Sequence, residues 1–217
     1  MAGRREAARD ERRRQIVDGA LRVFASRGFL AATNRDIAMA AGIGSPGLIY
    51  HYFASKGELL RAVIERHSPP LQLLAHREEI SALPVEAALR RIGSAFIQAV
   101  NDDQIGPCMR MMIGEASRST EFAALLSEVG PMPLWRFLAG YLGDRMAAGL
   151  LRPEDPDAAA RCFIGPLVSY MVQRRVLCQA AAAELDTHEL LETTIRIFLH
   201  GMQLPAGAAA ALPGASR

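Results

Sequence analysis

Apolar residues recur at three- and four-residue intervals along most of the chain, in runs that are interrupted by short segments containing Gly, Pro or Asp. This spacing is typical of amphipathic helices, whose buried stripe repeats every 3.6 residues. We find no convincing stretch of alternating, β-branched residues that would indicate strands. Alanine is abundant and favours helix. The pattern therefore predicts an all-α protein.

The first expected helix runs from about residue 10 to Arg27, with an apolar stripe that includes Ile16 and Phe24. Gly28 follows directly, as the left-handed cap that ends many helices requires. The residues before this helix, 1–9, are basic and are expected to form a flexible arm.

A pair of short helices follows. Thr33 and Asp36 have the spacing of a capping box, which opens a second helix that Gly42 ends after about two turns. Ser45 followed by Pro46 combines an N-cap with proline at the first helical position, so a third helix begins at once and runs to about residue 52. Two short helices joined by a tight turn that contains glycine form a helix-turn-helix.

Ser55 and Glu58 repeat the capping-box spacing and open a fourth helix, which Ser68-Pro69-Pro70 interrupts. We therefore predict a helix-turn-helix domain at 1–67, a larger helical domain at 68–203, and a disordered low-complexity tail at 204–217. The expected helices of the larger domain cover about 70–81, 85–101, 107–118, 120–128, 131–149, 156–179 and 186–202.

The third helix has two different faces. Ile49 and Phe53 lie four residues apart and share the face expected to pack on the first two helices. The opposite face carries Pro46, Gly47, Tyr50 and His51, with Ser45 and Leu48 beside it. A small three-helix bundle has only one interior, so this second face is expected to point outward.

The distribution of charge indicates what that face contacts. Residues up to His67 include twelve Arg or Lys against seven Asp or Glu, a net charge of +5, whereas the rest of the chain carries −3. A net positive N-terminal surface favours a polyanion such as DNA. Tyr and His can reach phosphates and base edges, and Gly47 permits close approach to a groove. Lys56, the only lysine, and Thr33 each begin a helix, where free N–H groups attract phosphate. The alternative is that these are ordinary solvated and packing side chains.

Three segments carry a close resemblance to the DNA-binding domain of TetR-family (tetracycline-repressor-like) transcriptional regulators: QIVDGALRVFASRGF, TNRDIAMAAGIG and SPGLIYHYFASKGELL. The resemblance covers about the first 65 residues. It implies a fold of about nine helices, a homodimer on a palindromic operator, and release of the DNA when a small ligand binds the C-terminal domain. Position by position, it assigns operator contacts to Thr33, Ser45, Pro46, Gly47, Tyr50, His51, Tyr52 and Lys56.

Two of these positions differ from the rest. Tyr52 is assigned by the resemblance alone, because the helical spacing does not place it on the outward face. Pro46 departs from the basic or polar residue that the family often has at its position.

The resemblance also suggests dimerisation through the last two long helices, near 156–179 and 186–202. The sequence agrees, because the first of them is apolar almost all round and needs partners on every side. Its apolar residues are Phe163, Ile164, Leu167, Val168, Met171 and Val172, and the last helix has a stripe of Leu191, Ile195, Phe198 and Met202. A four-helix interface between two copies would bury both sets.

A ligand site would lie among the helices between about 85 and 180. Candidate lining residues combine adaptable methionines with aromatic rings: Phe96, Met109, Met112, Met132, Trp135, Phe163 and Tyr170. Arg110 and Glu115 are candidates to orient a polar group, with ion pairing as the alternative. Such a stripe is also typical of ordinary core, so the ligand is expected only to be small and mostly apolar.

Other functional classes have little support in the sequence. There is no G-x-S-x-G, no HExxH and no phosphate-binding glycine loop. Cys108, Cys162 and Cys178 fit no metal-binding spacing, and we interpret them as buried, inert thiols, with a redox sensor as the alternative. We expect no catalysis, cofactor or metal.

The chain shows no signal peptide and no apolar run of about 18 residues, which predicts a soluble, cytoplasmic protein. The hypothesis is thus a homodimeric, ligand-responsive repressor. A ligand-independent or activating DNA-binding regulator is the alternative.

Overall fold

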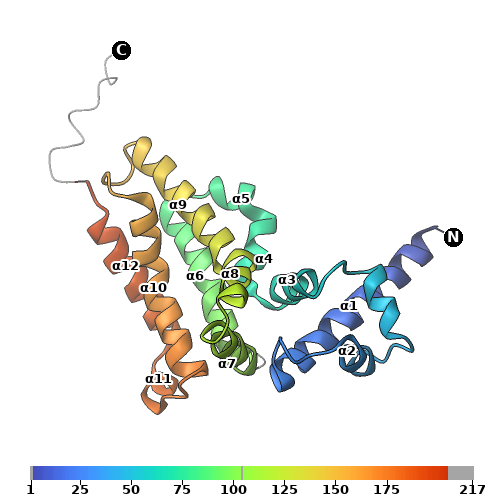
Figure 1. The fold of residues 1–217 in the computed structure, drawn as a ribbon. Coiled ribbons are helices and arrows are strands. Elements are labelled where there is room, and N and C mark those ends of the chain that lie inside the picture. The colour runs from blue at the N-terminus through green and yellow to red at the C-terminus, as the bar shows by residue number, and fades with distance from the viewer. Residues whose placement is uncertain (1, 104, 205–217) are drawn as a thin grey trace. The chain divides into compact units, whose positions relative to one another are not determined.

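The computed structural model describes residues 2–103 and 105–204, and within them it contains helices and no strands (Figure 1). Twelve α-helices and two 3-10 helices follow one another in these residues, which confirms the all-α prediction. They form two compact units: one contains the chain up to Leu71 together with Asp102–Pro131, and the other contains Gln72–Asn101 and the chain from Met132. No helix in the described residues combines the length and apolar character that a bilayer crossing requires.

The first unit contains the predicted helix-turn-helix. Its helices are α1 (Ala2–Arg27), α2 (Asn34–Ala40), η1 (Pro46–His51), α3 (Lys56–His67), α7 (Ile105–Ala116) and α8 (Thr120–Val129). The prediction of a flexible N-terminal arm is wrong, because residues 2–9 are helical and continue α1 without a break. Arg, Ala and Glu predominate there, and all three are good helix formers, so local propensity favours helix up to the N-terminal end.

The core of this unit is centred on α1, which lies against α2, α3 and α7. Ile16, Ala20 and Phe24 are fully buried on one stripe of α1. Phe29 continues this core, with ring centroids 5.2 Å from Phe24 and 4.9 Å from Phe122 of α8. The aromatic contacts join the turn after α1 to α8.

The packing of α7 and α8 differs from the predicted division of the chain. Both helices belong to the expected 68–203 domain, yet they form one compact unit with the helix-turn-helix. Compact packing and independent folding are separate properties, so the domain boundaries stay a prediction. The expected disordered tail lies, apart from residue 204, outside the described residues.

The second unit contains most of the remaining helices. A short helix, α4 (Pro69–Gln72), joins the units, and the second unit holds η2 (Leu73–His76), α5 (Arg77–Ser81), α6 (Val85–Asn101), α9 (Pro131–Ala147), α10 (Pro156–Arg175), α11 (Ala180–Glu184) and α12 (Thr187–Gly201). The stretch 70–81 was expected to be one helix and is instead three short ones, while α11 was not expected. These short pieces explain why the described residues hold more than about nine helices.

The apolar stripes of α10 and α12 are buried for the most part within the single chain, because α6, α10 and α12 pack against one another. Val168, Met171 and Val172 are only half-buried, and dimerisation through these helices stays a prediction. The rings of Phe163 and Phe198 meet edge-on at 5.4 Å, and Leu167 and Leu191 are also buried. The periodicity identified mostly buried positions, but it cannot tell whether the partner helix belongs to the same chain.

Candidate nucleic-acid interface

The capping box that opens α2 is formed as predicted. The Thr33 hydroxyl accepts a hydrogen bond from the Asp36 N–H at 3.2 Å, and the Asp36 carboxylate accepts one from the Thr33 N–H at 3.2 Å. The Thr33 hydroxyl also donates to that carboxylate at 2.6 Å, and Arg27 lies 2.8 Å from it. The hydrogen bond from the Thr33 side chain is the largest cause that lowers the pKa of Asp36. The polar groups of Thr33 are thus engaged in the cap.

The turn between α2 and η1 depends on Gly42. Its φ of +65° lies in the left-handed region, which favours glycine. The Ile43 N–H then donates to the carbonyl of Ala38 at 3.0 Å, and the Gly42 N–H to that of Met39 at 3.2 Å. Both bonds satisfy carbonyl groups at the end of α2, and the chain turns at once into η1.

The two faces of η1 have the predicted environments. Ile49 and Phe53 are each 2% exposed, whereas Tyr50 is 66% exposed. The other exposed residues of this segment are Ser45, Pro46, Gly47 and His51. The element is a 3-10 helix instead of the expected α-helix, but the two periods diverge by only about 20° per residue, so within a turn of Ile49 the faces keep their directions.

Tyr52 differs from its neighbours. It caps the C-terminal end of η1, is half-buried, and packs against the core of the first unit. The helical spacing did not place it on the outward face, and the structure gives part of its ring a packing role.

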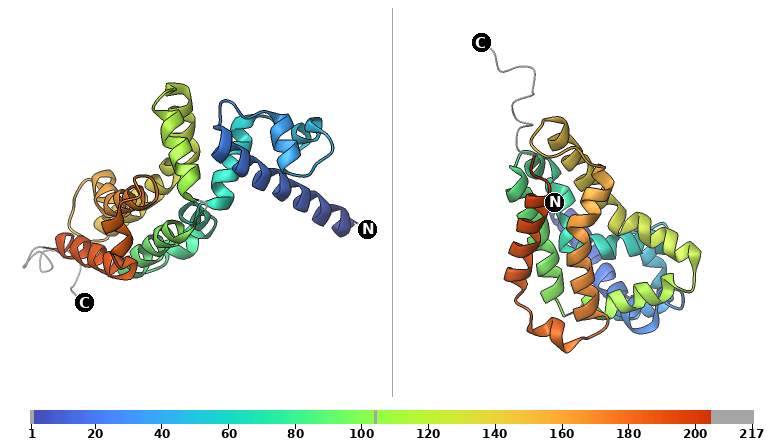
Figure 2. Two further views of the ribbon diagram at one scale, coloured as in Figure 1. Left: turned by 90° about the horizontal axis from the view of Figure 1, so that it is seen from below. Right: turned by 90° about the vertical axis from the view of Figure 1, so that its left-hand side faces the viewer.

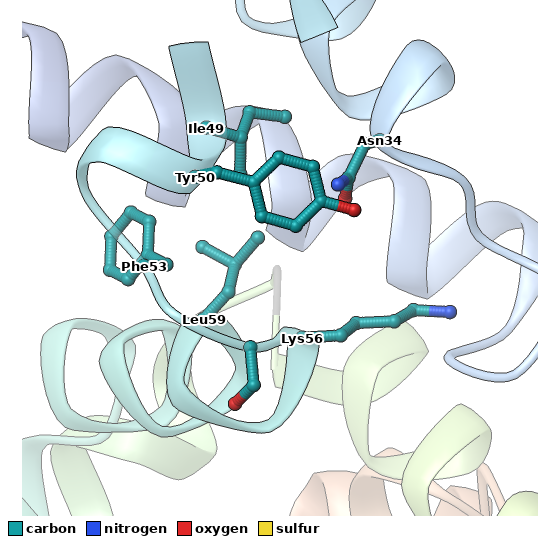
Figure 3. A pocket seen from close by; sticks show the side chains of 7 residues that line it. Asn34, Ile49, Tyr50, Phe53, Lys56 and Leu59 are labelled. Atoms are coloured by element: carbon teal, nitrogen blue, oxygen red, sulfur yellow. The ribbon is translucent and has the colours of Figure 1, made fainter. Parts of the chain in front are cut away.

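A hollow of about 270 Å³ lies between η1 and the start of α3 (Figure 3). Its lining residues are Asn34, Ile49, Tyr50, Phe53, Ser55, Lys56 and Leu59. Figure 3 shows the Tyr50 hydroxyl and the Asn34 amide on the same side of this hollow. Sequence reasoning missed Asn34, because nothing in its local pattern separates an outward residue of α2 from one beside η1.

Lys56 is held toward the protein. Its Nζ donates to the Leu30 carbonyl at 3.1 Å and lies 4.8 Å above the centre of the Phe29 ring. Burial lowers the pKa of Lys56, and the negative charge of Glu115 opposes this shift. The side chain therefore joins the start of α3 to the α1–α2 turn.

Glu115 of α7 is the buried charged side chain of the described residues, with 6% of its surface exposed. Its carboxylate accepts from the Leu30 N–H at 3.4 Å, so Leu30 is contacted by an acid at its N–H and by Lys56 at its carbonyl. Gly28, with a φ of +85°, leaves room for this carboxylate, because a Cβ there would lie 2.5 Å from the Glu115 Oε1. The expected roles of Glu115, a ligand contact or an ion pair, did not anticipate this contact with the turn.

The candidate ligand residues are divided between the units. Met109 and Met112 belong to the first unit, where Met112 packs against the core. The other five belong to the second unit: Phe96, Met132, Trp135, Phe163 and Tyr170. Of these, Phe96, Phe163 and Tyr170 are buried, and the Tyr170 hydroxyl accepts from Arg174 at 2.7 Å.

Trp135 has an unusual environment within the second unit. The Arg161 guanidinium lies 5.0 Å from the centre of its ring. Its indole N–H is buried and has no hydrogen-bond acceptor in the described residues. A buried donor without an acceptor is costly, so this N–H is suited to donate to an oxygen of a bound molecule. The Arg145 Nε is likewise buried without an acceptor in the described residues.

The cysteines are not all buried as expected. Cys108 lies in the core of the first unit, and burial raises the pKa of its thiol to about 11. Cys162 and Cys178 are exposed, which corrects the expectation for both. In the described residues, no group of three or more His, Cys, Asp or Glu side chains is placed to hold a metal ion.

Comparison with known proteins identifies both parts of the chain. Residues 16–63 match the bacterial regulatory proteins of the tetR family, and residues 87–201 match the AefR-like transcriptional repressor C-terminal domain. The chain belongs to the TetR family. Members of this family are DNA-binding transcription factors and not enzymes, which confirms the predicted class.

Two of the relatives are similar over about half of the chain. The regulator BetI of Rhizobium meliloti is 38% identical over 120 residues, which cover 53% of this chain and 57% of BetI. The activator FasR of Mycolicibacterium smegmatis is 36% identical over 98 residues, covering 45% of this chain and 44% of FasR. The chain thus spans about half the length of these relatives.

Solved TetR-family structures match along almost their whole length. The flavonoid-responsive regulator FrrA has a TM-score of 0.62 at 26% identity, covering 88% of this chain and 97% of FrrA. FadR of Bacillus subtilis was solved in complex with stearoyl-CoA. It has a TM-score of 0.65 at 20% identity, and the match covers 87% of this chain and 98% of FadR. The FadR match shows the shared fold.

Proposed function

We propose that this TetR-family protein is a cytoplasmic repressor that binds a palindromic operator as a homodimer and is released by a small, mostly apolar ligand. The observation that carries the DNA-binding part is the outward face of η1. Tyr50 is largely exposed there, one residue from the buried Ile49 that anchors η1 to the core. A side chain of this size on a firmly anchored short helix is suited to enter the major groove.

The proposed DNA contacts divide into two groups. Tyr50 and His51 reach base edges, and Gly47 lets the backbone come close to the groove. The remaining proposed residues contact phosphates or the groove wall: Thr33, Ser45, Pro46, Tyr52 and Lys56. Lys56 can do so only by moving away from Leu30, so its phosphate contact competes with the bond to that carbonyl.

Selection of tight binders from a pool of random duplexes tests this proposal. A dimer with two η1 faces should enrich an inverted repeat, with half-sites about one helical turn, or 34–36 Å, apart. Enrichment of a single half-site would exclude the dimeric arrangement. Enrichment of no sequence would exclude the proposed function.

The homodimer is proposed through the outward faces of α10 and α12. On α10, Cys162, Pro166 and Ser169 are exposed and lie three or four residues apart, on one face. On α12, Ile197 is 67% exposed although it is large and apolar. A face of small side chains on α10 and an exposed isoleucine on α12 favour close packing against a second copy.

A ligand is proposed because FrrA is flavonoid-responsive, and because the Trp135 N–H finds no acceptor among the residues that the structure describes. The ligand would be mostly apolar and carry an oxygen that accepts from this N–H. It can release the DNA only by binding more tightly to a form in which the two η1 faces do not match the half-sites.

Displacement of a fluorescent operator duplex by flavonoids tests the ligand, with stearoyl-CoA as a second probe. The effective compound should act about fivefold less well on Trp135→Phe, which keeps an aromatic ring and loses a hydrogen bond of about 1 kcal/mol. Equal potency on both proteins would exclude Trp135 as the polar contact. If no compound displaced the duplex, the ligand-independent alternative would be favoured.

Activation is the second candidate mode of regulation, because FasR is named an activator. The position of the operator relative to a promoter decides between the two modes. Transcription from the regulated promoter in a strain that lacks the protein distinguishes them, since it should rise for a repressor and fall for an activator.

A further inference from the structure

One edge of the core-facing side of α1 continues past the core as arginine. Ile16, Ala20 and Phe24 lie four residues apart and are fully buried. The same helical spacing, followed toward the N-terminus, reaches Arg12, Arg9 and Arg5. Arg5 and Arg9 are exposed and Arg12 is half-buried. One edge of the face that packs on the other helices of the unit therefore carries a row of guanidinium groups over the first turns of α1.

The row of Arg5, Arg9 and Arg12 contains no acidic residue. Glu6 and Asp10 lie at its side, since Glu6 precedes Phe24 by about five helical turns and points in the same direction, and Glu11 pairs with Arg14 at 2.9 Å. Within the described residues, Arg5, Arg9 and Arg12 have no carboxylate partner, although Arg12 donates to the Gln15 side chain at 3.0 Å.

The adjacent Arg13 shows which part of the unit this side of the helix faces. Its guanidinium lies 5.0 Å from the centre of the Phe53 ring, directly after η1. Figures 1 and 2 show the first turns of α1 projecting beyond α2, η1 and α3. Since α1 is one continuous helix docked in the core, the row is held in a fixed position relative to η1.

We propose that Arg5, Arg9 and Arg12 form a second DNA-binding surface, which contacts the phosphate backbone of the operator beside the groove that η1 enters. The proposal rests on the proposed function and extends the bound site beyond the recognition face. The rise of 1.5 Å per residue spreads the three side chains over about 10 Å. That length of duplex carries about six phosphate charges. Guanidinium groups bind phosphate oxygens in pairs, which suits such a row.

A binding experiment with matched variants tests this surface. The test variant is Arg5→Gln/Arg9→Gln/Arg12→Gln, and the control is Arg14→Gln/Arg118→Gln/Arg136→Gln, which removes the same charge from residues outside the row. Glutamine keeps the helix propensity of arginine. Each protein is titrated over a range of salt with the selected operator duplex, once without flanks and once with about ten extra base pairs on each side, one helical turn.

The wild type and the control should bind the flanked duplex more tightly than the short one. The test variant should lose this preference, and the log–log slope of affinity against salt should fall by about 0.9 for each lost phosphate contact. It should keep its preference for the operator over a shuffled duplex. A third variant, Arg5→Lys/Arg9→Lys/Arg12→Lys, should recover most of the slope because the charge remains.

If the test and control variants have the same affinities and slopes, the arginine row does not contact DNA, while the selective binding by η1 stands. Circular dichroism shows whether the first turns of α1 remain helical. If the lysine variant is helical but binds as weakly as the glutamine variant, contact through phosphate charge is excluded. If the wild type does not discriminate between operator and shuffled duplex, the proposed function fails, and this inference with it.

Discussion

At the scale of single residues, the neighbours Ile49 and Tyr50 have opposite roles. Ile49 is 2% exposed and Tyr50 is 66% exposed. Ile49→Ala should lower the free energy of unfolding by about 2–5 kcal/mol, as truncation of buried apolar side chains does. Tyr50→Ala should change it by no more than about 0.5 kcal/mol, as exposed positions do. Urea unfolding of both variants checks this, and a comparable loss for Tyr50→Ala would mean that its ring is part of the core.

Gly28 and Gly42 are a second pair of residues whose substitutions should differ in effect. Both have positive φ, so alanine should cost each about 1–2 kcal/mol of stability. A Cβ at Gly42 meets nothing within 4 Å, whereas one at Gly28 lies 2.5 Å from the Glu115 carboxylate. Gly28→Ala should therefore be the more destabilising in urea unfolding. The additional loss of stability in Gly28→Ala should disappear when both substitutions are made in a Glu115→Ala background. If the additional loss persisted there, it would contradict the described contact between Gly28 and Glu115.

At the scale of elements, α1 and α3 are joined by Asp18, which accepts from Arg66 at 2.8 Å and lies 3.0 Å from His67. Burial raises the pKa of Asp18, but the hydrogen bonds and charges of Arg66 and His67 together outweigh it, so the net pKa is lowered. A carboxylate with a lowered folded pKa adds stability above its unfolded pKa, and this stability is lost as pH falls through the folded pKa.

Asp18→Asn should therefore reduce stability at pH 7 by about 0.5–1 kcal/mol, the range for partly exposed pairs. The difference from wild type should shrink as pH falls below the ordinary Asp value of 3.8. Unfolding curves at pH 7 and at successively lower pH measure both effects. A difference that stays constant with pH would mean that the charge of Asp18 is not the cause.

How far the sequence predicts an element depends on how local its causes are. The capping box at Thr33 and the N-cap at Ser55 were predicted because their partners lie three residues away. The second box is not complete, because the Glu58 carboxylate accepts from the Ala54 N–H instead of that of Ser55. The Glu115–Leu30 contact spans 85 residues and the Arg66–Asp18 contact 48, so both depend on packing that no local pattern encodes. The faces of η1 were predicted because one buried anchor, Ile49, sets them. Its 3-10 geometry was not, since the apolar spacing of so short a helix suits both periods.

At the scale of the whole molecule, the proposed dimer makes its own prediction. Ile197→Arg places a charge in the proposed interface and should convert the dimer to a monomer, because an unpaired buried charge is strongly unfavourable. Leu150→Arg is the matched control, because Leu150 is also exposed, at 59%, and lies outside α10 and α12. Sedimentation velocity of both variants measures their oligomeric state. A dimeric Ile197→Arg variant would place the interface elsewhere.

The central claim is that the outward face of η1 reads DNA sequence. The most direct test is equilibrium binding of the wild type and Tyr50→Ala to a duplex from beside the protein's own gene and to a shuffled duplex, at several salt concentrations. The account predicts that the wild type prefers the first duplex and that both affinities fall steeply with salt. Tyr50→Ala should lose the preference while it keeps its affinity for the shuffled duplex. A folded Tyr50→Ala variant with undiminished preference would contradict the account.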